Sequence, residues 1–111
     1  MGMNYYVVGK WPTVRTPIHI GKSSIGWKFL FHRVSAWENY IDDKPLNTSK
    51  QWYSFLRDNE SLIYILNEED EIIEAEWLIN MIEQKQNIKN DEEFSYSDNI
   101  DGYRFTDGDF C

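Results

Sequence analysis

Residues 17–32 read PIHIGKSSIGWKFLFH, and the fold depends mainly on how this stretch is organised. Its first part, residues 17–20, is short and extended. Its last part, residues 26–32, alternates Trp, Phe and Phe with Lys, Leu and His, which is typical of a strand. The glycines and serines of residues 21–26 are typical of a turn. We therefore predict a hairpin with strands at 17–20 and 26–32 and a loop at 21–26.

The N-terminal half outside this stretch contains fewer signals. Residues 4–8 (NYYVV) are aromatic and β-branched and predict a first strand. Residues 9–17 contain two prolines and predict an irregular connection. Residues 34–47 are ambiguous, because 36–41 could form a helical turn and Pro45 would end any regular element.

Two helices are predicted further along the chain. Thr48 followed by Gln51 is typical of a capping box, and Trp52, Phe55 and Leu56 then form one apolar stripe. The second helix covers residues 74–86, and the members of its predicted buried face are Ala75, Leu78, Ile79 and Ile82.

Short strands and turns surround the second helix. Residues 62–66 predict a strand, residues 67–70 a turn, and residues 71–73 the second arm of a hairpin. Residues 87–101 are polar and predict a loop, and residues 102–105 predict a last strand. The fold class that follows is α+β: one small domain over residues 1–111, with antiparallel hairpins or a sheet packed against two helices.

Composition limits the class of protein. The 111 residues are 41% hydrophobic and 16% aromatic, and no apolar run approaches the length of a membrane span. No signal peptide is visible, so we expect a cytoplasmic protein without a membrane partner. Cys111 is the only cysteine and excludes an intrachain disulfide. With two histidines in the chain, we expect neither a zinc site nor a cofactor.

Charge is divided unevenly along the chain. Residues 1–57 carry a net charge of +5, residues 58–111 carry −13, and the whole chain carries −8. Two interpretations remain open: the halves attract each other within the fold, or the acidic half presents a surface to a basic partner. The overall negative charge disfavours direct binding of nucleic acid.

Residues 19–28 carry the candidate binding chemistry. A turn at Gly21 would present backbone N–H groups to an anion, and Lys22, Ser23 and Ser24 would add a charge and donors. The remaining candidates are a histidine that can donate when protonated, an aromatic ring and a second lysine; they are His19, Trp27 and Lys28. Together these residues are typical of a phosphate-binding or nucleotide-binding site.

The same residues match two named motifs only in part. Gly21-Lys22-Ser23 matches the end of a Walker A loop, but Thr16 replaces its first glycine and no helix follows. His19-Ile-Gly-Lys22 departs from the His-x-Gly-His signature of nucleotidylyltransferases at its last position. A purely structural interpretation also stays open, in which the glycines permit turns and Trp27 packs in the core.

The segment Ile18–Trp27 resembles a family of small, largely uncharacterised proteins of tailed bacteriophages. The resemblance extends over most of the chain; its other matching pieces are Asn4-Tyr5-Tyr6, Phe29-Leu30-Phe31, Trp52–Leu56, Glu76-Trp77 and Gly102–Phe105. Many members carry a Cys-x-x-Cys pair before the central motif, whereas this chain has none there. The resemblance implies a phage accessory protein, and it implies no particular activity.

The function predicted from these observations is non-enzymatic. We expect a phage counter-defence protein that binds a phosphate-bearing small ligand and sequesters a nucleotide-derived immune signal in the host cytoplasm. The alternative is an acidic inhibitor that binds a host defence protein and partly mimics nucleic acid. A nucleotide hydrolase is a third hypothesis, and a homo-oligomer remains open.

Overall fold

The computed structural model describes residues 2–12, 16–24, 28–86, 98–100 and 103–106. These residues form one mixed sheet and two α-helices, which confirms the α+β fold class. The strands are β1 (Gly2–Gly9), β2 (Ile18–Ser24), β3 (Leu30–His32), β4 (Ile63–Asn67), β5 (Ile72–Ile73), β6 (Asp98–Ile100) and β7 (Tyr103–Thr106). The helices are α1 (Ser49–Asp58) and α2 (Ala75–Lys85), with a 3-10 turn, η1 (Glu60–Leu62), after α1.

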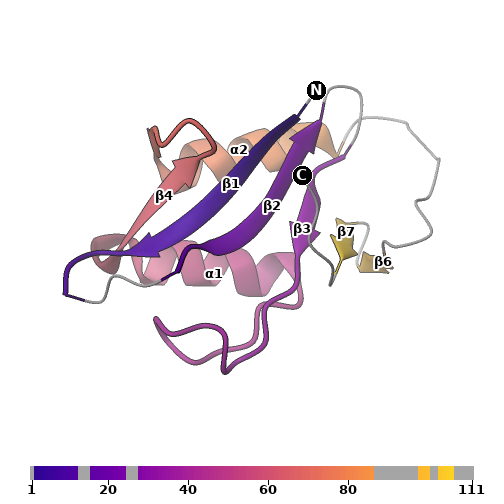
Figure 1. The fold of residues 1–111 in the computed structure, drawn as a ribbon. Helices are drawn as coiled ribbons and strands as arrows, with labels where there is room; N and C mark the ends of the chain where they lie inside the picture. The colour runs from indigo at the N-terminus through magenta and orange to yellow at the C-terminus, as the bar shows by residue number, and fades with distance from the viewer. Residues whose placement is uncertain (1, 13–15, 25–27, 87–97, 101–102, 107–111) are drawn as a thin grey trace.

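The sheet has seven strands in the order β5-β4-β1-β2-β3-β7-β6. Neighbouring strands are antiparallel except β3 and β7, which run parallel. Figure 1 shows α1 and α2 on the same side of the sheet, so the opposite side faces outward. Neither helix in the described part of the chain is long and apolar enough to cross a membrane.

The predicted helix signals are confirmed. The Thr48 hydroxyl accepts a hydrogen bond from the Gln51 backbone N–H at 3.1 Å, as an N-cap should. The apolar stripe of α1 is buried, and so are all four residues predicted for the buried face of α2. The same periodicity therefore specified both the helices and the side that each turns to the sheet.

The core lies between the sheet and the two helices. Tyr5 and Val7 point from β1 toward the helices, in line with alternate residues of the neighbouring strands. Trp52 of α1 is fully buried there, and its indole N–H donates to the backbone oxygen of His32 at 3.0 Å. A core side chain thus holds the backbone of β3 at His32.

The predicted loop over residues 21–26 is wrong for residues 21–24. β2 continues without interruption to Ser24, and its register against β1 shifts between Tyr5 and Tyr6. Gly21 is buried in this irregularity: a Cβ there would overlap the carbonyl oxygen of Leu30 and lie 2.5 Å from the Phe29 ring. Its backbone angle lies outside the left-handed region, so the missing side chain is what the packing requires.

The C-terminal part also differs from expectation. Residues 98–100 form strand β6, whereas the sequence predicted a loop over 87–101; residues 87–97 lie outside the described residues. The next strand, β7, is tied to the helices by Glu83, whose Oε2 accepts hydrogen bonds from Tyr53 at 2.7 Å and Tyr103 at 2.6 Å. Burial and this carboxylate raise the pKa of both tyrosines, which therefore stay protonated donors.

Candidate functional site

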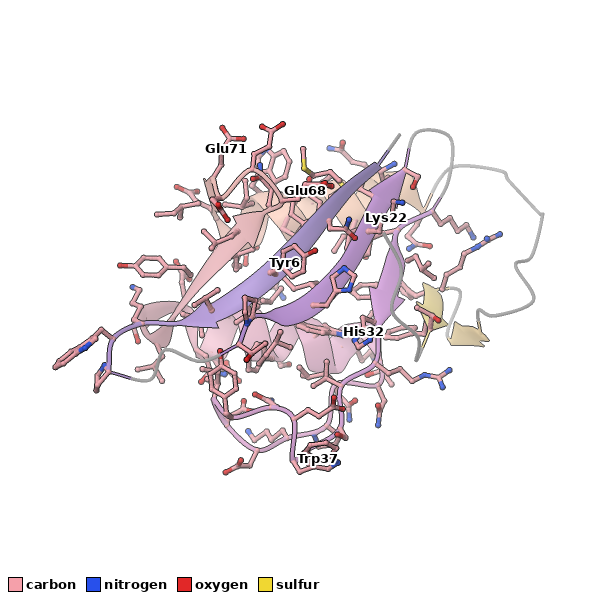
Figure 2. The ribbon with its side chains drawn as sticks, in the orientation of Figure 1. Tyr6, Lys22, His32, Trp37, Glu68 and Glu71 are labelled. Carbon is pink, nitrogen blue, oxygen red and sulfur yellow. The ribbon has the colours of Figure 1, made fainter. Side chains whose placement is uncertain are left out.

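The outward side of the sheet carries a row of rings across its central strands. Tyr6 of β1 lies opposite His19 of β2, and His32 of β3 lies opposite Thr106 of β7. The rings of Tyr6 and His19 stack with centroids 4.9 Å apart, and those of His19 and His32 stack at 5.4 Å. Figure 2 shows Tyr6 and His32 on this side, away from the helices.

His19 is fixed in one orientation and tautomer. Its Nε2 lies 3.0 Å from the Asn4 side-chain oxygen, and the Asn4 amide nitrogen lies 3.4 Å from Glu68 Oε1. Because the amide nitrogen donates to the carboxylate, the amide oxygen must accept, and Nε2 of His19 carries the hydrogen. Glu68 also accepts from the Asn4 backbone N–H at 2.8 Å, which anchors this chain of polar contacts.

The two histidines line one side of a hollow of about 430 Å³, here called the histidine hollow. Its outer side is formed by the segment after β3, which contributes Trp37, Glu38 and Tyr40. Figure 2 places Trp37 on the loop beyond His32. The Trp37 side chain is 84% exposed, which is unusual for so large an apolar ring. The volume lies within the range that small-molecule pockets occupy.

Glu38 is a charged group on this hollow. Its Oε1 accepts hydrogen bonds from the Ser35 hydroxyl at 2.6 Å and from the Ser35 backbone N–H at 3.2 Å. The Ser35 hydroxyl bond, followed by the backbone bond and the charge of His32, lowers the Glu38 pKa. The side chain is exposed, and it is ionised at neutral pH.

A neighbouring hollow of about 440 Å³ shares His32 and Glu38 with the histidine hollow. Arg33, Ser35 and Asn47 also line it. The two hollows therefore meet at one histidine and one carboxylate, and together they could receive a ligand that has a ring at one end and polar groups at the other.

The predicted binding residues of β2 do not form one cluster. His19 and Lys22 lie on the same side of the sheet, but the Lys22 stem lies against Gly2, toward the Ser24 end of the strand. Ser23 and Ser24 are paired with β1, and the Ser24 carbonyl accepts a hydrogen bond from Lys85 at 2.7 Å. Burial lowers the pKa of this lysine.

The remaining predicted residues do not form the binding loop that the sequence predicted. Gly21 serves packing, as described above, so the anion-binding turn predicted at that position is not formed. Lys28 is partly exposed and lies in the connection that leads to β3, and Phe29 after it is fully buried. Trp27 lies outside the described residues. Of the predicted residues that the structure describes, His19 alone lines the histidine hollow.

Sequence reasoning missed the residues on the outer side of the hollow. His32 was not among the predicted site residues, and Trp37, Glu38 and Tyr40 belong to the segment that gave no clear pattern. The available signal was a Trp next to a Glu in a polar stretch without strand or helix periodicity. Such a Trp gains no burial from a regular element, so its exposure could have been suspected.

Metal binding finds no support in the geometry of the described residues. In the ranges that the structure covers, no three His, Cys, Asp or Glu side chains are grouped closely enough to hold an ion. The side chains that line the histidine hollow offer ring stacking, hydrogen bonding through imidazole, and one carboxylate.

Comparisons with known proteins identify no relative. No protein-family model, no curated protein and no solved structure matches the chain. The resemblance to a phage family stays a prediction.

Proposed function

We propose that this protein binds a small molecule that carries both a planar ring and a phosphate, and that it does not catalyse a reaction of this molecule. The observation that carries the proposal is the histidine hollow, in which two stacked imidazoles face a loop with a Trp ring that is 84% exposed. A nucleotide-derived molecule combines the two chemical parts that such a site recognises.

The ring of the ligand would stack on Trp37. Stacking of a base on an aromatic side chain contributes about 1–3 kcal/mol, and it tolerates different bases because each has a π face. Since Trp37 is already exposed, a ligand would cover apolar surface that water now contacts.

The phosphate would lie against the histidines. The neutral His19 ring gives its single N–H to Asn4, so it donates to a phosphate only in its protonated form, which has a second N–H and a positive charge. The His19 ring is held by Asn4, and the His32 ring stacks on it with centroids 5.4 Å apart, so both rings are restrained before a ligand binds. Preorganised donors lose less entropy on binding than mobile ones.

The biological role proposed with this activity follows the phage resemblance. A small protein that binds a nucleotide-derived immune signal one-to-one would lower its free concentration in the host cell. Sequestration and hydrolysis are distinguished by product formation: a hydrolase converts excess ligand at catalytic amounts of protein, whereas a sequestering protein leaves it unchanged.

The test is calorimetry of the native protein against nucleoside monophosphates, ADP-ribose and cyclic oligonucleotides. We expect one or more of these to bind, and Trp37→Ala to weaken binding by about fivefold to a hundredfold, the equivalent of one lost stacking contact. Trp77→Ala is the matched control, because Trp77 is 52% exposed on α2, on the opposite side of the sheet.

Two results would overturn the proposal. One is a complete absence of binding across the panel. The other is a ligand that binds the Trp37→Ala variant as tightly as the native protein, because the ring would then be bound elsewhere.

A second candidate function, binding of a basic host protein, is favoured by a different surface. Ile72 on the edge strand β5 is 68% exposed, and Trp77 at the start of α2 is also exposed, within a stretch that carries six acids between residues 68 and 76. Charge attraction and apolar contact would act together there. A pull-down of host proteins that survives Ile72→Ser with Trp77→Ser, or that ignores added salt, would exclude this surface.

A further inference from the structure

Glu38 is placed where the two hollows meet, one residue after the exposed Trp37. Both side chains line the histidine hollow. A ring stacked on the Trp37 indole would present its polar edge within its own plane, and Glu38 is the acidic residue that lines the same hollow. The carboxylate is therefore positioned to distinguish one ring edge from another.

The two oxygens of Glu38 have different roles. Both hydrogen bonds that it accepts from described residues, one from the Ser35 hydroxyl and one from the Ser35 backbone N–H, end on Oε1. Oε2 remains available to a ligand. Because Ser35 restrains the carboxylate through Oε1, Oε2 is an acceptor with a restricted position, and not the end of a freely rotating side chain.

We propose that Glu38 is a specificity-determining residue that selects a ring with N–H donors on its edge, with guanine as the base that fits best. This inference rests on the proposed function and names the ligand class of that site. An ionised carboxylate accepts hydrogen bonds and donates none, so it attracts N–H groups and repels ring nitrogens and carbonyls that have lone pairs.

Guanine meets this requirement more fully than the other bases. Its N1–H and its 2-amino group are adjacent donors on one edge. Adenine has one amino group beside an acceptor nitrogen, and hypoxanthine has N1–H without the amino group. A carboxylate therefore favours guanine over both, and hypoxanthine is the most closely matched comparison because it lacks only that amino group.

The experiment measures the affinities of guanosine and inosine monophosphates for the native protein and for Glu38→Gln. Gln keeps an oxygen for the two Ser35 donors and replaces the free acceptor by an amide donor. We expect the native protein to prefer the guanine nucleotide by about fivefold or more, the effect of one charge-assisted hydrogen bond at an exposed site. Glu38→Gln should abolish or reverse the preference.

The control is Glu60→Gln, which removes one exposed carboxylate on η1, away from both hollows, and should leave the preference unchanged. Equal urea midpoints of the two variants and the native protein would show that folding is unaffected.

The outcomes separate this inference from the proposed function. If nucleotides bind and Trp37→Ala weakens them, but the preference is absent or survives Glu38→Gln, the specificity role of Glu38 is overturned and the proposed function stands. If no nucleotide binds the native protein, both are overturned.

Discussion

Replacement of Gly21 by Ala tests whether the central motif serves packing or ligand binding. The added Cβ would overlap the Leu30 carbonyl oxygen and lie 2.5 Å from the Phe29 ring. The Leu30 oxygen belongs to the backbone of β3, which pairs with β2 at this point, so it cannot move aside without disturbing the pairing. Phe29 is fully buried and has little space into which to rotate.

The expected magnitude follows from two opposing effects. Overpacking a well-filled site costs about 1–3 kcal/mol, and an overlap with backbone belongs at the upper end of that range. The loss of glycine flexibility in the unfolded chain offsets about 0.4–1 kcal/mol. We therefore expect Gly21→Ala to lower the free energy of unfolding by about 2 kcal/mol, equivalent to a Tm lower by about 10 °C in a domain of this size.

Urea unfolding followed by tryptophan fluorescence and circular dichroism measures this change. Ser23→Ala, two residues along the same strand and partly exposed, is the control and should stay within about 0.5 kcal/mol of the native protein. A Gly21→Ala variant that is as stable as the native protein, but has lost ligand binding, would refute the packing argument and restore the functional interpretation of this glycine.

Three further predictions address the site, the tyrosine contacts of Glu83 and the core. His32→Ala should weaken binding of a phosphate-bearing ligand several-fold, because the substitution removes an imidazole that lines the hollow and could donate to the phosphate; calorimetry of the variant checks it, and an unchanged affinity would exclude His32 from phosphate binding. Glu83→Gln should cost about 1 kcal/mol of stability, because one carboxylate oxygen accepts from two tyrosines, and faster amide exchange in β7 than in β1 would locate the loss. Leu78→Ala should cost about 2–5 kcal/mol in urea unfolding, because this side chain is fully buried, and a cost below about 1 kcal/mol would contradict its place in the core.

The sequence predicted the elements whose pattern is local. Thr48 and Gln51 are three residues apart, and Ala75 to Ile82 span two helical turns, so their roles could be derived from short stretches. Gly21 was misinterpreted because glycine followed by serines is typical of turns, whereas the reason for glycine here is the ring of Phe29, eight residues away. The spacing of residues along the sequence does not show that the Phe29 ring packs against Gly21.

The candidate site was predicted only in part for a similar reason. His19 was identified from its neighbours in sequence, but the hollow combines β2, the end of β3 and the loop after it. Only the folded sheet brings His32 beside His19. Trp37 and Glu38 have no periodic pattern, and their role follows from exposure and hydrogen bonding, which sequence does not reveal.

The hydrogen bond from the Trp52 indole to the His32 backbone connects the core to the histidine hollow. It joins the most buried ring of α1 to a residue that lines the hollow, so the proposed function implies that ligand affinity depends on core packing. A ligand that binds only the native arrangement will raise the unfolding midpoint, and the shift will grow with the logarithm of the ligand concentration above its Kd. A thermal-shift screen of chemically diverse compounds therefore tests the proposed binding, and core variants that loosen Trp52 should weaken any binding it finds without touching the ligand.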